Sequence, residues 1–148
     1  MRNAREENAF VAIDVAGVGA AAVLAGLSAV HVYWAVGGRR GGAAAIPTVD
    51  GRPQLSPSRG ATLLVAALLV VSAGLLVGGV AEWAPQVVYR VGCGGVGLVL
   101  LARAVGDRRF VGFLKRQRGT EFARRDTMLY SPLCLALGSV AVIVSAAS

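Results

Sequence analysis

Residues 61–80 read ATLLVAALLVVSAGLLVGGV, a run without a single charged side chain. A helix of about 20 apolar residues is long enough to cross the hydrocarbon core of a bilayer, which is about 30 Å thick. This stretch therefore predicts a membrane-spanning helix. If this helix spans a membrane, apolar stretches of similar length on either side are also candidate spans.

Three other stretches have the same apolar character. Together they predict spans over residues 10–36, 60–80, 85–105 and 127–147. Pro85 suits the first turn of the third span, and Asp126 can cap the fourth. Pro132 lies inside the fourth span, where it predicts a kink or makes Ser131 an alternative cap. We expect an all-α integral membrane protein, a four-helix bundle that forms a single domain over residues 1–148.

The overall composition supports this fold class. Of the 148 residues, 55% are hydrophobic and only 16% are charged, whereas soluble domains carry about 25% charged residues. This composition argues against disorder and against a soluble fold. The two cysteines, Cys93 and Cys134, stand alone in apolar surroundings, which excludes a disulfide scaffold and predicts buried packing residues.

The first span could instead be a cleaved signal peptide. Its leader carries Glu6 and Glu7 beside Arg2 and Arg5, so it lacks a basic n-region. The apolar run is also longer than the roughly 7–15 residues of a signal peptide. We expect this segment to be retained as a span.

The distribution of basic residues predicts the orientation. Twelve of the fifteen Lys and Arg residues fall on the face that carries the loops 37–59 and 106–126. Lys and Arg are retained on the cytoplasmic side of a membrane. We therefore expect both loops in the cytoplasm, both termini outside, and a location in the bacterial cytoplasmic membrane.

Small residues predict where the helices pack, because close backbone approach stabilises helix pairs in lipid. Gly74 and Gly78 form a GxxxG motif, and Gly17 begins a row of small residues in the first span. These surfaces suit seams within the bundle or a homo-oligomer. Residues 92–97 also match the GxGxxG nucleotide fingerprint, but no βαβ unit surrounds them, so they too are interpreted as packing residues.

The 106–126 segment combines basic and apolar side chains. Phe110, Phe113 and Leu114 would share one face of a helix, which predicts a short basic helix lying in the headgroup region between spans three and four. Its expected partners are membrane lipids with anionic headgroups. Topology determination alone is the alternative. The predicted headgroup contacts are Arg108, Arg109, Lys115, Arg116 and Arg118.

Polar residues from three spans fall in the predicted cytoplasmic interface layer. Ionisable groups at membrane depth are candidate functional residues, but Trp, Tyr and Arg also form ordinary boundary belts. Arg103 and Asp107 are four residues apart, so a helical ion pair is expected. The candidate polar cluster consists of His31, Trp34, Arg103, Asp107, Asp126, Tyr130 and Ser131.

Several motifs within and beside these spans, taken together, resemble a known family. The resemblance is to small bacterial four-span membrane proteins catalogued as a domain of unknown function. It implies the fold and the membrane location but no activity. The residues that carry it are His31-Val-Tyr-Trp34-Ala-Val-Gly37-Gly38, Arg103-Ala-Val-Gly106-Asp107, Phe110-Val-Gly-Phe113, Phe122-Ala123, Asp126-Thr127 and Tyr130-Ser-Pro-Leu-Cys-Leu135.

Three functions fit the sequence. The first is a non-enzymatic accessory module that binds lipid or a partner membrane protein, because no catalytic, metal-binding, cofactor-binding or nucleic-acid-binding constellation is present. The second is a membrane enzyme acting on a lipid-like substrate, with His31 as acid or base and Asp107 orienting it. The third is a proton-coupled exporter that uses Asp14, a carboxylate within the first span.

Overall fold

The computed structural model describes residues 4–42, 45–49, 52–81 and 85–147, and it confirms the four predicted spans. Three are single helices: α1 (Ala4–Ala35), α2 (Arg59–Ala81) and α3 (Gln86–Val105). The fourth is continuous but has three parts: α4 (Glu121–Arg125), the π-helix η2 (Asp126–Tyr130) and α5 (Ser131–Ala147). Helices predominate because a backbone in lipid must satisfy its own hydrogen bonds.

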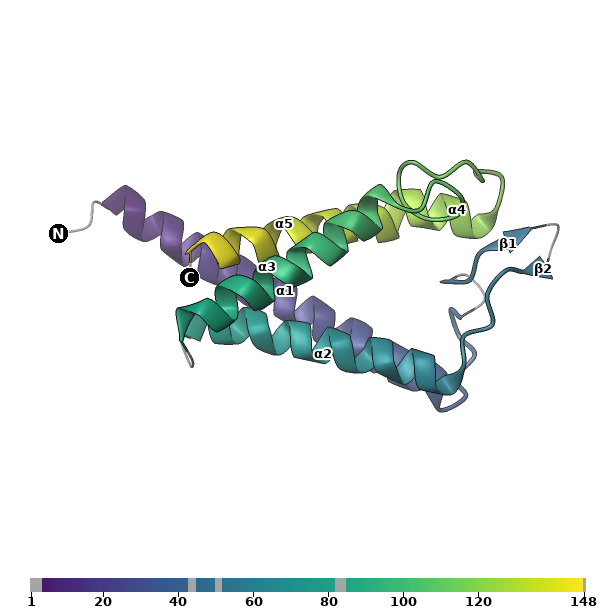
Figure 1. The fold of residues 1–148 in the computed structure, drawn as a ribbon, viewed down its shortest axis with the longest axis horizontal. Coiled ribbons are helices and arrows are strands. Elements are labelled where there is room, and N and C mark those ends of the chain that lie inside the picture. Colours follow the sequence, from purple (N-terminus) through teal and green to yellow (C-terminus); the bar gives the residue numbers. More distant parts are fainter. Residues whose placement is uncertain (1–3, 43–44, 50–51, 82–84, 148) are drawn as a thin grey trace.

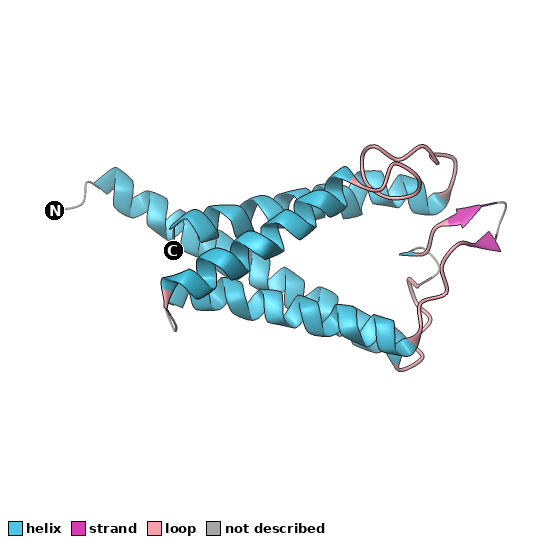
Figure 2. Ribbon diagram, viewed as in Figure 1, coloured by secondary structure: helices cyan, strands magenta, loops and turns pink. Residues whose placement is uncertain are grey.

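The helices associate as two antiparallel pairs rather than as one evenly packed bundle. α1 packs along α2, and α3 packs along α5. Figure 1 shows the two pairs crossing near the middle of α1 and diverging from there toward the end at which α1 finishes. Both long connections lie at that diverging end, which we call the loop end; Figure 2 shows them as mostly irregular segments.

The core lies where the two pairs cross. Leu24, Leu76, Cys93 and Ala141 are fully buried there. Each comes from a different helix, so this cluster joins all four spans. Cys93 is therefore the buried packing residue that the sequence predicts.

Glycines allow the closest helix contacts. A Cβ on Gly97 would lie 3.0 Å from the carbonyl oxygen of Gly138, and a Cβ on Gly138 would lie 3.1 Å from that of Gly97. The α3–α5 seam therefore depends on small residues. The two glycines of the α2 GxxxG motif differ: a Cβ on Gly78 would overlap the Tyr89 ring, whereas a Cβ on Gly74 would meet nothing within 4 Å.

Polar side chains set the helix boundaries. The Ser58 Oγ accepts a hydrogen bond from Ala61 N at 3.1 Å at the start of α2. The Thr120 Oγ1 accepts one from Ala123 N at 3.1 Å, so the fourth helical segment begins six residues before the predicted position. Asp126 is thus inside the helix and does not cap it.

The π-helix precedes Pro132, the residue for which a kink or a cap at Ser131 was expected. Proline lacks the N–H that an α-helix requires and its ring crowds the carbonyl four residues earlier. The wider turn over Asp126–Tyr130 accommodates this, and Ser131 N donates to the Asp126 carbonyl. π-Helical turns of this kind occur frequently at functional sites.

Within the 106–126 segment the short basic helix is α4, and Phe110, Phe113 and Leu114 do not share the helical face that the sequence predicts. Residues 106–120 form a loop that folds back onto the end of α3, with Phe113 N donating to the Ala104 carbonyl at 2.9 Å. Gly106 and Gly112 have φ angles of 92° and 85°, which a helix does not allow. A Cβ on Gly106 would overlap the backbone of Val111, and a Cβ on Gly112 would overlap the backbone of Gly106.

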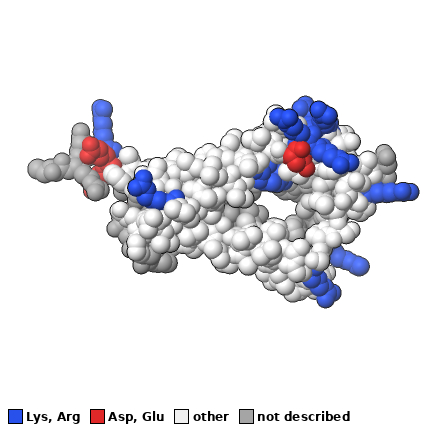
Figure 3. Space-filling view, viewed as in Figure 1, with Lys and Arg blue, Asp and Glu red and all other residues white. Residues whose placement is uncertain are grey.

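Charged side chains lie mostly at the loop end. Figure 3 shows them gathered over the 106–125 segment and along the 37–59 connection, with few along the middle of the molecule. The connection between α1 and α2 contains one short antiparallel pair, β1 (Thr48–Val49) with β2 (Arg52–Pro53). The structure therefore places both predicted basic loops at one end.

Candidate functional site

The loop end of the α3–α5 pair is organised around the Asp126 carboxylate, which is fully buried. Its Oδ1 accepts a hydrogen bond from Arg103 Nη2 at 2.8 Å. Its Oδ2 accepts from Gly112 N at 2.8 Å, Lys115 Nζ at 2.8 Å and Ser131 Oγ at 3.1 Å. A buried charge is tolerated only when it is paired and hydrogen-bonded. This carboxylate therefore ties α3, the loop and α5 together.

Lys115 completes this arrangement from the loop. Its ammonium donates to the Gly112 carbonyl at 3.0 Å, to Asp126 Oδ2 at 2.8 Å and to Thr127 Oγ1 at 2.6 Å. These contacts use all three of its protons. With only 2% of the residue exposed, Lys115 is not available to a headgroup, so its predicted lipid contact is wrong. We call Arg103, Gly112, Lys115, Asp126 and Ser131 the Asp126 centre.

The predicted ion pair between Arg103 and Asp107 is absent. α3 ends at Val105, and the positive φ of Gly106 takes Asp107 off the helical face that Arg103 occupies. Arg103 instead pairs with Asp126, 23 residues away. Its other terminal nitrogen, Nη1, is buried and has no hydrogen-bond partner within the described residues.

Asp107 shapes the loop. Its Oδ1 accepts hydrogen bonds from the backbone N–H groups of Arg109, Phe110 and Val111 at 2.9, 2.8 and 3.0 Å. Desolvation acts to raise the pKa of Asp107, but these N–H groups outweigh it and hold the pKa below its ordinary value of 3.8. The ionised carboxylate therefore stabilises the turn that follows α3.

The remaining cluster candidates divide between the two helix pairs. Tyr130 is half-buried beside Phe122, with ring centroids 6.2 Å apart. His31 and Trp34 lie on α1, where their rings meet edge to face at 5.2 Å. His31 Nδ1 bonds to the Leu27 carbonyl at 2.7 Å. The structure thus gathers part of the predicted cluster around Asp126 and places His31 and Trp34 on the other pair.

This division bears on the two alternative functions. The enzyme hypothesis requires Asp107 to orient His31, but Asp107 binds its own loop and His31 binds Leu27. The exporter hypothesis requires a carboxylate inside the bundle, whereas Asp14 is exposed on the outer face of α1. Within the described residues, no three His, Cys, Asp or Glu side chains are grouped to hold a metal ion. The geometry therefore supports neither alternative function.

Exposed arginines surround the Asp126 centre. The guanidinium of Arg109 lies over the Phe110 ring, 4.9 Å from its centroid, and Arg125 pairs with Glu121 at 2.6 Å. Exposed Phe113 and Leu114 lie on the same loop. We call these arginines the basic surface: Arg108, Arg109, Arg116, Arg118, Arg124 and Arg125.

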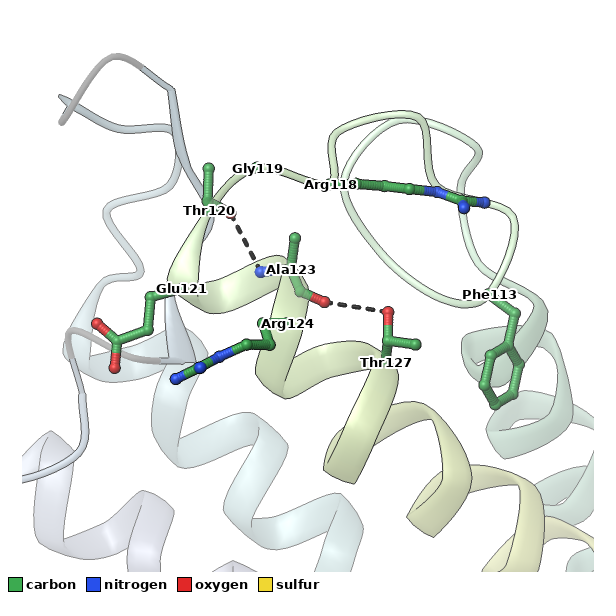
Figure 4. Close-up of a pocket in the computed structure, with 8 residues that line it drawn as sticks. All are labelled: Phe113, Arg118, Gly119, Thr120, Glu121, Ala123, Arg124 and Thr127. Atoms are coloured by element: carbon green, nitrogen blue, oxygen red, sulfur yellow. Dashed lines mark hydrogen bonds between the residues drawn. The ribbon is translucent and has the colours of Figure 1, made fainter.

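A cavity of about 780 Å³ opens within the basic surface. Figure 4 shows Arg118 on the loop and Arg124 on α4, with the hydrogen bonds that join Thr120 to Ala123 and Ala123 to Thr127. The wall therefore combines the cationic side chains of Arg118 and Arg124 with fixed hydroxyl groups, and its one carboxylate, Glu121, is paired with Arg125. Such a wall can bind a phosphate or carboxylate group.

The sequence interpretation missed the role of Lys115, although the sequence contained a signal. Lys115 is the single lysine among fifteen basic residues. An ammonium is compact and offers three donors, whereas a guanidinium is planar and offers five. A buried position with three acceptors therefore suits lysine. The backbone donor of Gly112 left no comparable signal, because its contribution depends on the fold of the loop.

Residues 13–141 match the family described as Protein of unknown function (DUF3995). No curated protein and no solved structure is detectably similar to the chain. The match covers α2, α3, both loops and the Asp126 centre in full, and most of α1 and α5. The chain therefore belongs to the DUF3995 family, as the resemblance in its loop and span motifs implies.

Proposed function

We propose that the protein is a non-catalytic module of the bacterial cytoplasmic membrane that binds anionic lipid headgroups at its loop end. The observation that carries this proposal is the basic surface, which surrounds a loop held by a buried carboxylate. Basic residues beside an anionic leaflet each contribute about 1 kcal/mol. A loop that is already ordered loses less entropy when it binds.

The orientation forms part of the proposal. Both loops lie at one end of the helices, and the start of α1 and the end of α5 lie at the other. The positive-inside rule favours the loop end in the cytoplasm. There the basic surface would meet the anionic leaflet.

The composition of the surface also suits insertion into the headgroup region. Phe113 and Leu114 are 40% and 54% exposed beside the arginines. Apolar side chains next to cations are typical of segments that lie in the membrane interface. A partner membrane protein with an acidic loop would use the same side chains, so the experiment must separate lipid from protein.

The test uses the full chain in a mild detergent, with native mass spectrometry to count bound lipids. Phosphatidylglycerol should be retained and phosphatidylcholine should be lost. Replacing Arg118 and Arg124 with Gln removes about 2 kcal/mol, which corresponds to a roughly 30-fold weaker affinity for phosphatidylglycerol. High salt should weaken binding in the same direction.

The matched control carries Arg52→Gln and Arg59→Gln, which remove the same charge from the other connection. Equal losses in the two double variants would mean that net charge, rather than this surface, sets the affinity. Equal retention of phosphatidylglycerol and phosphatidylcholine would contradict the proposal. If an acidic protein co-purifies in place of lipid, the partner-protein alternative replaces it.

A further inference from the structure

A second cavity, of about 720 Å³, lies on the other helix pair. It is bounded by the end of α1, the start of α2 and the connection between them. Its volume falls within the range of roughly 300–1,000 Å³ in which most small-molecule sites fall. It shares no lining residue with the cavity in the basic surface.

The connection is held over the helix ends by specific hydrogen bonds. Trp34 Nε1 donates to the Arg40 carbonyl at 2.8 Å, and Arg40 N donates to the Tyr33 hydroxyl at 3.4 Å. Further along, Gln54 N donates to the Pro47 carbonyl at 2.8 Å beside the β1–β2 pair. These contacts fix the wall that faces the helices, so the cavity is part of the fold.

The wall is mainly apolar, with polar groups on the α1 side. Ile46, Leu55 and Val65 supply apolar surface, and His31 and Arg39 supply the titratable groups. Of the described residues that line the cavity, none is acidic. The lining therefore favours a ligand with an apolar body and a negative head.

The hydrogen bond of His31 fixes which nitrogen is available. A carbonyl oxygen only accepts, so Nδ1 must carry the proton that it shares with Leu27 at 2.7 Å. Nε2 is then the ring atom left for a ligand, and in the neutral ring it accepts a hydrogen bond. The edge-to-face contact with Trp34 holds the ring in this orientation.

We propose that this cavity binds an anionic amphiphile with a single apolar chain, such as a fatty acid or a lysophospholipid. Arg39 would neutralise the head, and the chain would lie along Leu55 and Val65. Where the head carries a hydroxyl, as in a lysophospholipid, His31 Nε2 would accept a hydrogen bond from it. A ligand of this class reaches the site from the surrounding lipid. The proposal rests on residues that the headgroup proposal does not use, so each can fail alone.

Trp34 lines the cavity and provides the readout. In a Trp83→Phe background it is the sole tryptophan. Bromine-labelled stearate should then quench Trp34 fluorescence in a saturable manner in protein held in nanodiscs. Unlabelled oleate should reverse the quenching, whereas oleyl alcohol, which has the same chain without the charge, should not.

Two variants test the head and the body of the ligand separately. Arg39→Gln should weaken saturable quenching at least fivefold, while Arg40→Gln, which alters the neighbouring arginine outside the cavity, should leave it unchanged. Ala61→Leu should abolish the saturable component by filling the cavity; Ala61 is exposed, so the larger side chain displaces no core residue. Ala25→Leu, on an exposed part of α1 outside this cavity, is the control.

The results separate the possible ligands. Competition by lysophosphatidylglycerol alone would identify a phosphodiester head, and competition by oleate alone would identify a carboxylate head. Quenching that never saturates, equal effects of Arg39→Gln and Arg40→Gln, or full competition by oleyl alcohol would overturn the proposal.

Discussion

Lys115 and Asp126 form a buried ion pair with a distance of 2.8 Å between Nζ and Oδ2, across 11 residues of chain. The lysine comes from an irregular loop and the aspartate from a π-helical turn. The pair therefore couples the conformation of the loop to that of the fourth span. Removing Asp126 would leave the Lys115 ammonium buried without an ion-pair partner, whereas removing Lys115 would leave Asp126 with Arg103 alone.

We expect Lys115→Met to lower the free energy of unfolding by roughly 3–5 kcal/mol, the usual cost of breaking a buried ion pair. Thermal unfolding in detergent measures this loss. Arg116→Met, which alters the exposed neighbour, should change stability little. Adding Asp126→Leu to Lys115→Met should restore part of the loss, because the two side chains are energetically coupled. Additive losses would contradict this account.

Gly112→Ala should release the loop from the end of α3. At Gly112 the φ angle is 85°, and a Cβ there would overlap the backbone of Gly106. Strain of this kind costs about 1–3 kcal/mol. Limited proteolysis should cut the 106–120 loop faster in this variant. Gly119→Ala, where the new Cβ contacts nothing within 4 Å, should be cut at the wild-type rate.

Gly97→Val should separate α3 from α5. The added side chain would meet Val142 and the Gly138 backbone, and overpacking of this kind costs about 1–3 kcal/mol. A lower melting temperature in detergent measures the effect. Gly95→Val is the matched control on the same helix, since its Cβ contacts nothing within 4 Å. If Gly97→Val and Gly95→Val have the same melting temperature, Gly97 does not lie at the α3–α5 contact.

The turn after α3 should loosen in acid because of Asp107. Its pKa is lower in the folded protein than in the unfolded chain, so its contribution to stability is complete above about pH 4 and is lost as the pH falls through the lowered value. Hydrogen exchange of the Arg109–Val111 amides should accelerate over this interval. Asp107→Ala should exchange rapidly at every pH. If the acid transition persists in Asp107→Ala, a group other than Asp107 causes it.

Both loops should be accessible from the cytoplasm. Cysteines introduced at Ser56 and Gln117 should be labelled by a membrane-impermeant maleimide only in inside-out vesicles. A cysteine at Glu6 should be labelled only in intact spheroplasts. The opposite pattern would mean that the orientation is inverted, so that the basic surface faces away from the cytoplasmic, anionic leaflet.

The spans could be predicted from the sequence, whereas the contacts between loop and helix could not. The apolar run of residues 61–80 needs only a bilayer to become a helix, so composition was sufficient there. Two carboxylates, Asp107 and Asp126, lie at the membrane depth predicted for Arg103, and either could be its ion-pair partner. Helical spacing favours Asp107, four residues away. The choice of Asp126 depended on where Gly106 ended α3, which spacing alone does not reveal.

Sequence spacing also does not reveal which helices pair, and this is why the sequence predicts His31 in one cluster with Asp126. Depth in the membrane can be predicted from chain position: His31 lies near the end of α1, and Asp126 begins η2, just after the 106–120 loop and α4. Lateral position cannot, since it depends on which helices pair. The pairing of α1 with α2 and of α3 with α5 separates residues that share a depth.

The divergence of the two helix pairs also gives the protein an asymmetric profile. It is narrow where the pairs cross and broad at the loop end, so it displaces more lipid area from one leaflet than from the other. A bilayer accommodates such a tapered inclusion at least elastic cost where it bends toward the broad side. We expect the protein to accumulate in regions whose loop-side leaflet is convex, and tubulated vesicles of graded diameter would measure that sorting.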